Sequence, residues 1–230
     1  MKTKRLLSVL YLLLLVSLCS HAHAQPQLST SPQTIINGKV WVPAYSITKG
    51  EQFFLSKIEL TGNLKFKGKD FKHLKIFYDI SKEEIITSIQ TKDNTSCNII
   101  VNPYFLEGFT VFENDKSYHF KRGDFIHEDL QPTDYYQVFT GSKLIYIVKH
   151  TKRRILNSRN NGSKTFKYID DSRMYMIVNN KLSSIKNKTD LLNFFPQRKK
   201  KIKQFIRSEK LKINKHTPLD ALPILAKFDQ

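Results

Sequence analysis

Residues 109–120 read FTVFENDKSYHF, and their pattern predicts an antiparallel β-hairpin. Asn114 and Asp115 tolerate the positive φ angles of a two-residue hairpin loop, and apolar residues alternate with polar ones on both sides. A loop there predicts these cross-strand pairs: Glu113 with Lys116, Phe112 with Ser117, Val111 with Tyr118, Thr110 with His119 and Phe109 with Phe120. One face is then apolar, Thr110 and His119 lie on the wetter face, and each pair contributes roughly 0.2–1 kcal/mol.

Similar strand patterns fill residues 51–187. Residues 71–80, FKHLKIFYDI, place Leu74, Ile76 and Tyr78 on one face by period two, with Asp79 on the other. Residues 143–150 and 173–178 are apolar on both faces, which predicts interior strands covered on both sides, either by a second sheet or by terminal helices. Strands do not alternate with long helical patterns, which argues against a parallel sheet. Turn signals recur at Gly62-Asn63, Asp93-Asn94, Gly141-Ser142, Asn161-Gly162 and Asn179-Asn180.

The pattern becomes helical at Thr189, which is a good N-cap for residues 190–195. Pro196 suits the first turn of a second helix over residues 196–212. On that helix Ile202, Phe205 and Ile206 form one apolar stripe, and basic residues fill the remaining surface.

A last helix is expected to start at Thr217-Pro218, with Asp220 completing a variant of the capping box. Pro223 requires this helix to be short or kinked. The sequence therefore predicts an α+β, mainly β fold: an antiparallel meander, barrel-like or a sandwich, with C-terminal helices packed on it.

The N-terminus has the features of an export signal. Residues 1–24 place three cations before an apolar stretch from Leu6 to Leu18 and end in Ala22-His23-Ala24. This stretch is short for a transmembrane helix, so no span is expected after cleavage. We expect a signal peptide at 1–24, a leader at 25–50, an antiparallel β domain at 51–187 and a basic helical segment at 188–230. The predicted location is the periplasm or the exterior, including a peripheral position at the outer membrane.

Charge is the most prominent feature of the composition. The chain holds 38 Lys+Arg and 20 Asp+Glu, a formal net charge of +18, and removal of the signal peptide leaves 18 − 3 = +15. Cleavage also removes Cys19 and leaves Cys97, which we expect to be buried in a strand or paired between chains.

The C-terminal segment, DLLNFFPQRKKKIKQFIRSEKLKI, resembles a group of small exported bacterial β-rich proteins without an assigned activity. The group shares a tail of the form Leu-Phe-Pro, basic run, Ile, Phe-Ile and Lys-Leu, and FKHLKIFYDISKEEIITSI is similar as well. The resemblance covers about residues 50–215, and the prolines at 218 and 223 depart from it. It implies a β-rich exported protein, without a catalytic motif to transfer.

The basic tail is the candidate contact site. Residues 189–230 hold ten Lys/Arg and four Asp/Glu, a net charge of +6. Such a helix can dock on anionic lipid headgroups or lipopolysaccharide phosphates, whereas the plain alternative is a solvated basic face. Export and the small number of arginines argue against nucleic acid as the partner. The residues predicted to contact an anionic surface are Arg198, Lys199, Lys200, Lys201, Lys203 and Arg207.

The sequence contains no recognisable motif for metal binding or catalysis. His119, His127, Glu128 and Asp129 do not match a compact metal-ligand spacing. Neighbouring acids, including Glu83-Glu84 in an expected solvated turn, do not form a close dyad in a strand. No nucleophile or phosphate-loop motif is found, so no catalytic residue, metal or cofactor is expected.

Two hypotheses on function follow. The first is a non-enzymatic envelope accessory or scaffold that acts through protein contacts or on an anionic surface. The alternative is a small-ligand carrier or hydrolase with a pocket between sheet and helices, for which Tyr118, His119 and Tyr146 are the candidate lining residues.

Overall fold

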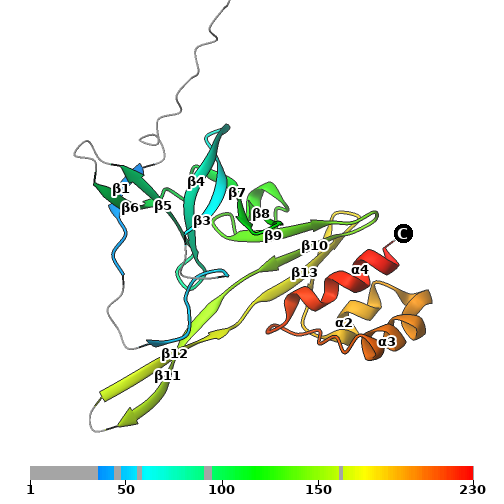
Figure 1. Ribbon diagram of the computed structural model, residues 1–230. Coiled ribbons are helices and arrows are strands. Elements are labelled where there is room, and N and C mark those ends of the chain that lie inside the picture. The colour runs from blue at the N-terminus through cyan, green and yellow to red at the C-terminus, as the bar shows by residue number, and fades with distance from the viewer. Residues whose placement is uncertain (1–35, 44–47, 56–58, 91–94, 161–162, 230) are drawn as a thin grey trace, which may run out of the picture. The chain divides into compact units, whose positions relative to one another are not determined.

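The computed structural model describes residues 36–43, 48–55, 59–90, 95–160 and 163–229 as a mainly β protein with C-terminal helices (Figure 1). The strands are β1 Ile36–Val40, β2 Thr48–Lys49, β3 Leu60–Phe66, β4 Lys69–Asp79, β5 Glu84–Gln90, β6 Ser96–Val101, β7 Leu106–Glu113, β8 Lys116–Arg122, β9 Tyr135–Thr140, β10 Ile145–Lys149, β11 Lys152–Asn160, β12 Ser163–Asp170, β13 Arg173–Val178 and β14 Lys181–Ile185. The helices are α2 Lys188–Asn193, α3 Lys199–Ser208 and α4 Leu222–Phe228, with 3-10 turns η2 Gly123–Phe125, η3 Pro196–Arg198 and η4 Pro218–Ala221.

Eleven strands form one antiparallel sheet in the order β1-β6-β5-β4-β3-β7-β8-β9-β10-β13-β14. Most neighbours are also consecutive in the chain, so the predicted meander is confirmed. The sheet curves enough for side chains from β3 to β9 to meet in one buried cluster. Its edge strands β1 and β14 are not paired with each other, so this curvature does not produce a closed barrel.

The remaining strands form a small second sheet in the order β11-β12-β2, in which β2 runs parallel to β12. β11 and β12 continue β10 and β13 after short kinks, as one long two-stranded ribbon. Tyr168 donates a hydrogen bond to Gln52 Oε1 at 3.0 Å, which ties the ribbon to the segment before β3. β1 and β2 both lie within residues 25–50, the range predicted as a leader.

The hairpin at residues 109–120 has the predicted register at every pair. Phe109, Val111 and Phe120 are buried, while His119 is exposed on the other face. Asn179 and Asn180 also form the predicted turn between β13 and β14, both with positive φ. The turns expected at 93–94 and 161–162 lie outside the described residues.

The turn expected at Gly62-Asn63 is wrong, because both residues lie inside β3. The turn comes at Lys67-Gly68, where both φ angles are positive. Gly62 serves close packing instead: a Cβ there would lie 2.5 Å from the Thr110 carbonyl oxygen. A glycine inside a strand often marks such a close approach between backbones.

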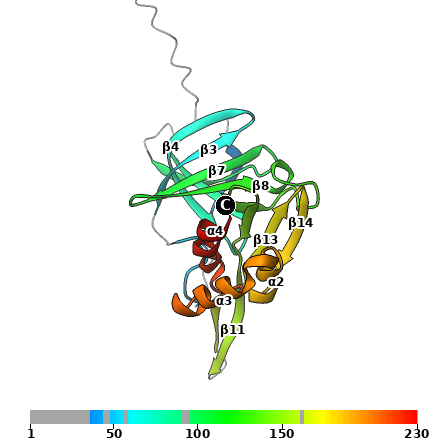
Figure 2. The ribbon, with the colours of Figure 1, turned by 90° about the vertical axis from the view of Figure 1, so that its right-hand side faces the viewer.

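The C-terminal helices pack on one face of β10, β13 and β14 (Figures 1 and 2). Tyr146 and Val148 point into this second core, where they meet Ile202, Ile206 and Ile224. The opposite face of the same strands is covered by the segment between β8 and β9, through residues such as Leu130. Both faces of β10 are therefore buried, as predicted.

Two helix caps differ from the prediction. Asn187, rather than Thr189, caps α2, and its Oδ1 accepts from the backbone N–H of Thr189 at 2.7 Å. The capping box at Thr217 does not form, because Asp220 Oδ2 accepts from the N–H of Lys212 at 2.7 Å. α4 is short and carries a proline in its first turn, as expected.

Candidate functional site

The basic face of α3 brings together most of the residues that the sequence predicts as an anionic contact. At 3.6 residues per turn, positions 200, 203 and 207 lie within about 60° of one another around the helix axis. Ile202 and Ile206 lie on the opposite side and are 0% and 6% exposed. The sequence therefore fixes α3 to the sheet through its apolar stripe and turns its cations outward.

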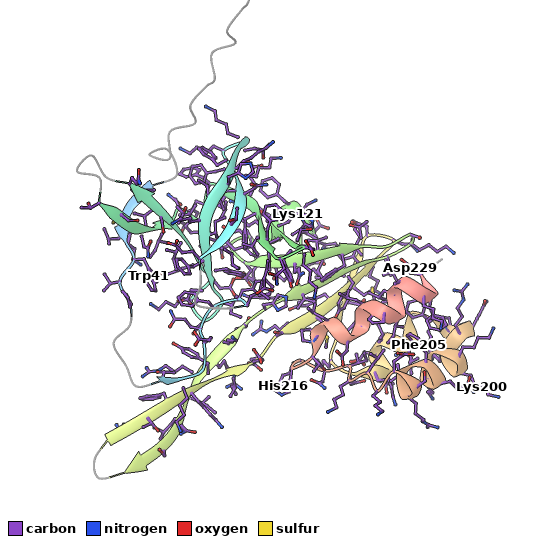
Figure 3. The ribbon with its side chains drawn as sticks, viewed as in Figure 1. Trp41, Lys121, Lys200, Phe205, His216 and Asp229 are labelled. Atoms are coloured by element: carbon purple, nitrogen blue, oxygen red, sulfur yellow. The ribbon has the colours of Figure 1, made fainter. Side chains whose placement is uncertain are left out.

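The α3 cluster is defined as Lys200, Lys201, Lys203 and Arg207, which are all exposed. Figure 3 shows Lys200 extending away from α3, whereas Phe205 lies between α3 and α4. Phe205 packs edge-on against Phe228, with ring centroids 5.7 Å apart. Within the described part of the chain, the side chains of the α3 cluster are not engaged in an ion pair, so their charges face solvent.

Two other predicted contact residues have structural partners. Lys199 is half-buried and donates to Asn193 Oδ1 at 3.1 Å. Arg198 is exposed, and its Nη1 donates to the Phe228 carbonyl oxygen at 2.8 Å, which links η3 to the end of α4. Both residues therefore stabilise the arrangement of the helices, and the α3 cluster carries the free charge.

The three residues expected to line a pocket do not converge. Tyr118 packs against the first core and His119 lies on the opposite face of the same strand. Tyr146 is buried in the second core, where its hydroxyl donates to the Pro218 carbonyl oxygen at 2.7 Å. Aliphatic and aromatic side chains fill that core, so the space directly beneath the helices is occupied.

The histidines and acids considered as metal ligands are also separated. His119 bonds with Thr110 and Ser117 on the sheet, whereas His127 is buried and contacts the Asn180 carbonyl oxygen at 3.0 Å. The described residues contain no group of three or more His, Cys, Asp or Glu side chains that could hold a metal ion. Cys97 is a half-buried free thiol in β6.

A partly buried charge network around Glu83 is not apparent from the sequence. The prediction of a solvated Glu83-Glu84 turn is wrong, because their side chains are only 23% and 19% exposed. Glu83 Oε1 lies 3.7 Å from Lys149 Nζ, and Lys149 also pairs with Asp134. The Tyr78 hydroxyl donates to Glu83 Oε2 at 3.1 Å.

The environment of Glu83 favours its neutral form. The pKa of its carboxyl is raised to about 7, chiefly by burial and also by the neighbouring Asp134, against the lowering effects of Lys149 and of the hydrogen bond from Tyr78. Glu83 also has a positive φ of 59°, which is unfavourable for a residue other than glycine. It borders a cavity of about 260 Å³ that also contacts Tyr135. The network can therefore take up or release a proton near neutral pH.

A second cavity, of about 550 Å³, lies at the edge of the helical layer. Arg173 begins β13, Lys186 directly follows β14, and Asn214 to His216 come from the loop between α3 and η4. The loop residues lie 28 or more positions along the chain from the β13 and β14 residues that they meet, so their convergence depends on the fold.

Comparisons of the chain with known protein families, curated proteins and solved structures found no match. The resemblance to exported bacterial proteins therefore stays a prediction. None of the described helices is long and apolar enough to cross a membrane.

Proposed function

We propose that this protein is an exported accessory of the cell envelope that docks on anionic lipid through the basic face of α3. The observation that carries the proposal is the α3 cluster: four exposed cations on a helix whose apolar stripe is fixed to the sheet. Because the helix is already folded and packed, docking does not require the chain to order a new segment.

Electrostatics sets the expected strength of this contact. A basic residue close to an anionic membrane contributes about 1 kcal/mol, so four of them supply at most about 4 kcal/mol. That contact is weak, reversible and sensitive to salt, since exposed charges are screened over about 8 Å at physiological ionic strength. The docking is therefore peripheral.

Vesicle flotation tests the proposal. The protein is mixed with neutral phosphatidylcholine vesicles, with vesicles containing anionic phosphatidylglycerol and with vesicles containing lipopolysaccharide. We expect flotation with one or both anionic preparations, and loss of flotation at high salt. Comparison of the two preparations identifies the source of the phosphates. Equal flotation with neutral and anionic vesicles would refute the proposal.

Matched variants separate α3 from overall charge. In one variant the four residues of the α3 cluster are replaced by Glu. In the control, four exposed lysines of the sheet are replaced by Glu: Lys69, Lys72, Lys116 and Lys181. Both variants carry the same net charge, but only the first changes the α3 cluster. We therefore expect only the first variant to lose vesicle binding. If both lose it equally, net charge rather than α3 is responsible, and the proposal fails. Circular dichroism confirms that both variants are folded.

A further inference from the structure

We propose that the cavity between the start of β13, the end of β14 and the loop after α3 binds a small organic anion with an apolar body. This site is separate from the basic face of α3 and does not depend on its role. The cavity measures about 550 Å³, within the range of about 300–1,000 Å³ typical of small-molecule sites.

The floor of the cavity is apolar. Met174 and Ile185 line it, and they are 1% and 2% exposed. They face each other across the β13–β14 pairing, so two rigid strands hold this surface in place. A thioether packs well against aromatic rings and irregular apolar shapes. The floor therefore suits the apolar body of a ligand rather than a bare inorganic ion.

The rim of the cavity is cationic. Arg173 begins β13 and Lys186 directly follows β14, at the same end of this antiparallel pair, and both are exposed. Within the described ranges, neither side chain has an ion-pair partner. Figure 3 shows His216 beside the start of β13, where the loop after α3 approaches the sheet. An Arg guanidinium presents a planar fork of donors that matches a carboxylate or phosphate group.

Asp171 also lines the cavity, but its negative charge does not neutralise Arg173 and Lys186. Asp171 pairs with Arg153, Nε to Oδ2, at 2.7 Å, and with Lys215, Nζ to Oδ1, at 2.6 Å. The hydrogen bond from Lys215, together with both positive charges, lowers the pKa of the Asp171 carboxyl. Asp171 thereby positions Lys215 at the rim, while Arg173 and Lys186 stay available. An apolar floor beneath a cationic rim selects an anion with an apolar body.

Methionine methyl NMR tests the site directly, because the chain contains three methionines. Both methionines belong to the second core, but Met174 lines the cavity and Met176 does not, so Met176 serves as an internal control. The probes are phenyl phosphate and benzoate, with benzylamine and benzyl alcohol as cationic and neutral controls, each up to about 10 mM. We expect at least one anionic probe to shift the Met174 methyl signal saturably, with little change at Met176. The comparison of phosphate with carboxylate identifies the preferred anionic group.

A double variant tests the role of charge. Arg173→Gln with Lys186→Gln should weaken anionic-probe binding roughly tenfold or more, as expected for the loss of two nearby charges. Lys116→Gln with Lys181→Gln removes the same charge elsewhere and should leave the affinity unchanged. The proposal is overturned if neither anion shifts Met174, if benzylamine or benzyl alcohol binds as well as the anions, or if the two double variants behave alike.

Discussion

Replacing Glu83 by Gln should change how the stability of this protein depends on pH. The pKa of Glu83 lies near 7 in the folded protein, against 4.5 for an ordinary Glu. Between these values the folded state holds more protons than the unfolded state, so the free energy of unfolding falls as the pH rises. This loss of stability reaches its full value above pH 7, where the Glu83 carboxyl is ionised in the folded state as well.

The difference between about 7 and 4.5 corresponds to about 3 kcal/mol, at 1.36 kcal/mol for each pKa unit. Gln cannot ionise, and it keeps nearly the same shape. Relative to wild type, Glu83→Gln should therefore gain stability as the pH rises from 4.5, by up to about 3 kcal/mol above pH 7.

The contribution of His150 to stability depends on pH in the opposite direction to that of Glu83. The His150 Nε2–H donates a 2.7 Å hydrogen bond to Gln137 Oε1. Burial lowers the His150 pKa to about 4, assisted by the nearby charge of Lys152. Between pH 4 and 6.5 the unfolded state holds more protons, so stability rises with pH. The contributions of Glu83 and His150 therefore nearly cancel between pH 4.5 and 6.5, and Glu83→Gln exposes the rising contribution of His150.

Urea unfolding followed by circular dichroism at half-unit steps from pH 4 to 9 measures this difference. The exposed Glu128→Gln variant is the control for loss of one carboxyl. A difference between Glu83→Gln and wild type that stays constant between pH 5 and 8 would show that the buried network does not raise the Glu83 pKa. Comparing each variant with wild type removes the contributions of the other acids.

Three further substitutions test the packing, each by urea unfolding. Gly62→Ala should cost about 1–3 kcal/mol, because its Cβ would meet the Thr110 carbonyl oxygen at 2.5 Å; an unchanged midpoint would contradict this contact. Asn187→Ala should cost about 1 kcal/mol through loss of the α2 cap, and Asn187→Ser should restore most of it. Ile202→Ala should cost about 2–5 kcal/mol by opening the second core, whereas the exposed Gln204→Ala should have little effect.

Local features of the fold could be predicted from the sequence because short-range rules determine them. The two-residue loop at Asn114-Asp115 fixes the register of its hairpin, and every predicted pair forms. The apolar stripe of α3 follows from helix periodicity alone. Gly62 misleads such reasoning because a glycine that permits close strand packing has the same local signature as a turn.

The buried network and the cationic cavity could not be predicted in this way. Glu83 is an ordinary surface acid by its neighbours in sequence, and its burial depends on Lys149 and Asp134, more than fifty positions away. The cavity likewise forms only where β13 and β14 meet the loop after α3. Patterns of hydrophobicity show which faces are buried but not which distant side chains meet there.

The late position of the helices in the chain has a consequence for biosynthesis. The second core needs contacts such as that of Tyr146 with Pro218, 72 residues apart, and that of Lys143 with Asp229, 86 residues apart. A chain that has been synthesised only as far as β14 therefore exposes the apolar face of β10, β13 and β14 that the helices later cover. Such exposed apolar surfaces make an incomplete chain prone to aggregation, and chaperones bind surfaces of this kind. The second core is therefore completed only when the C-terminal helices are available to cover these strands.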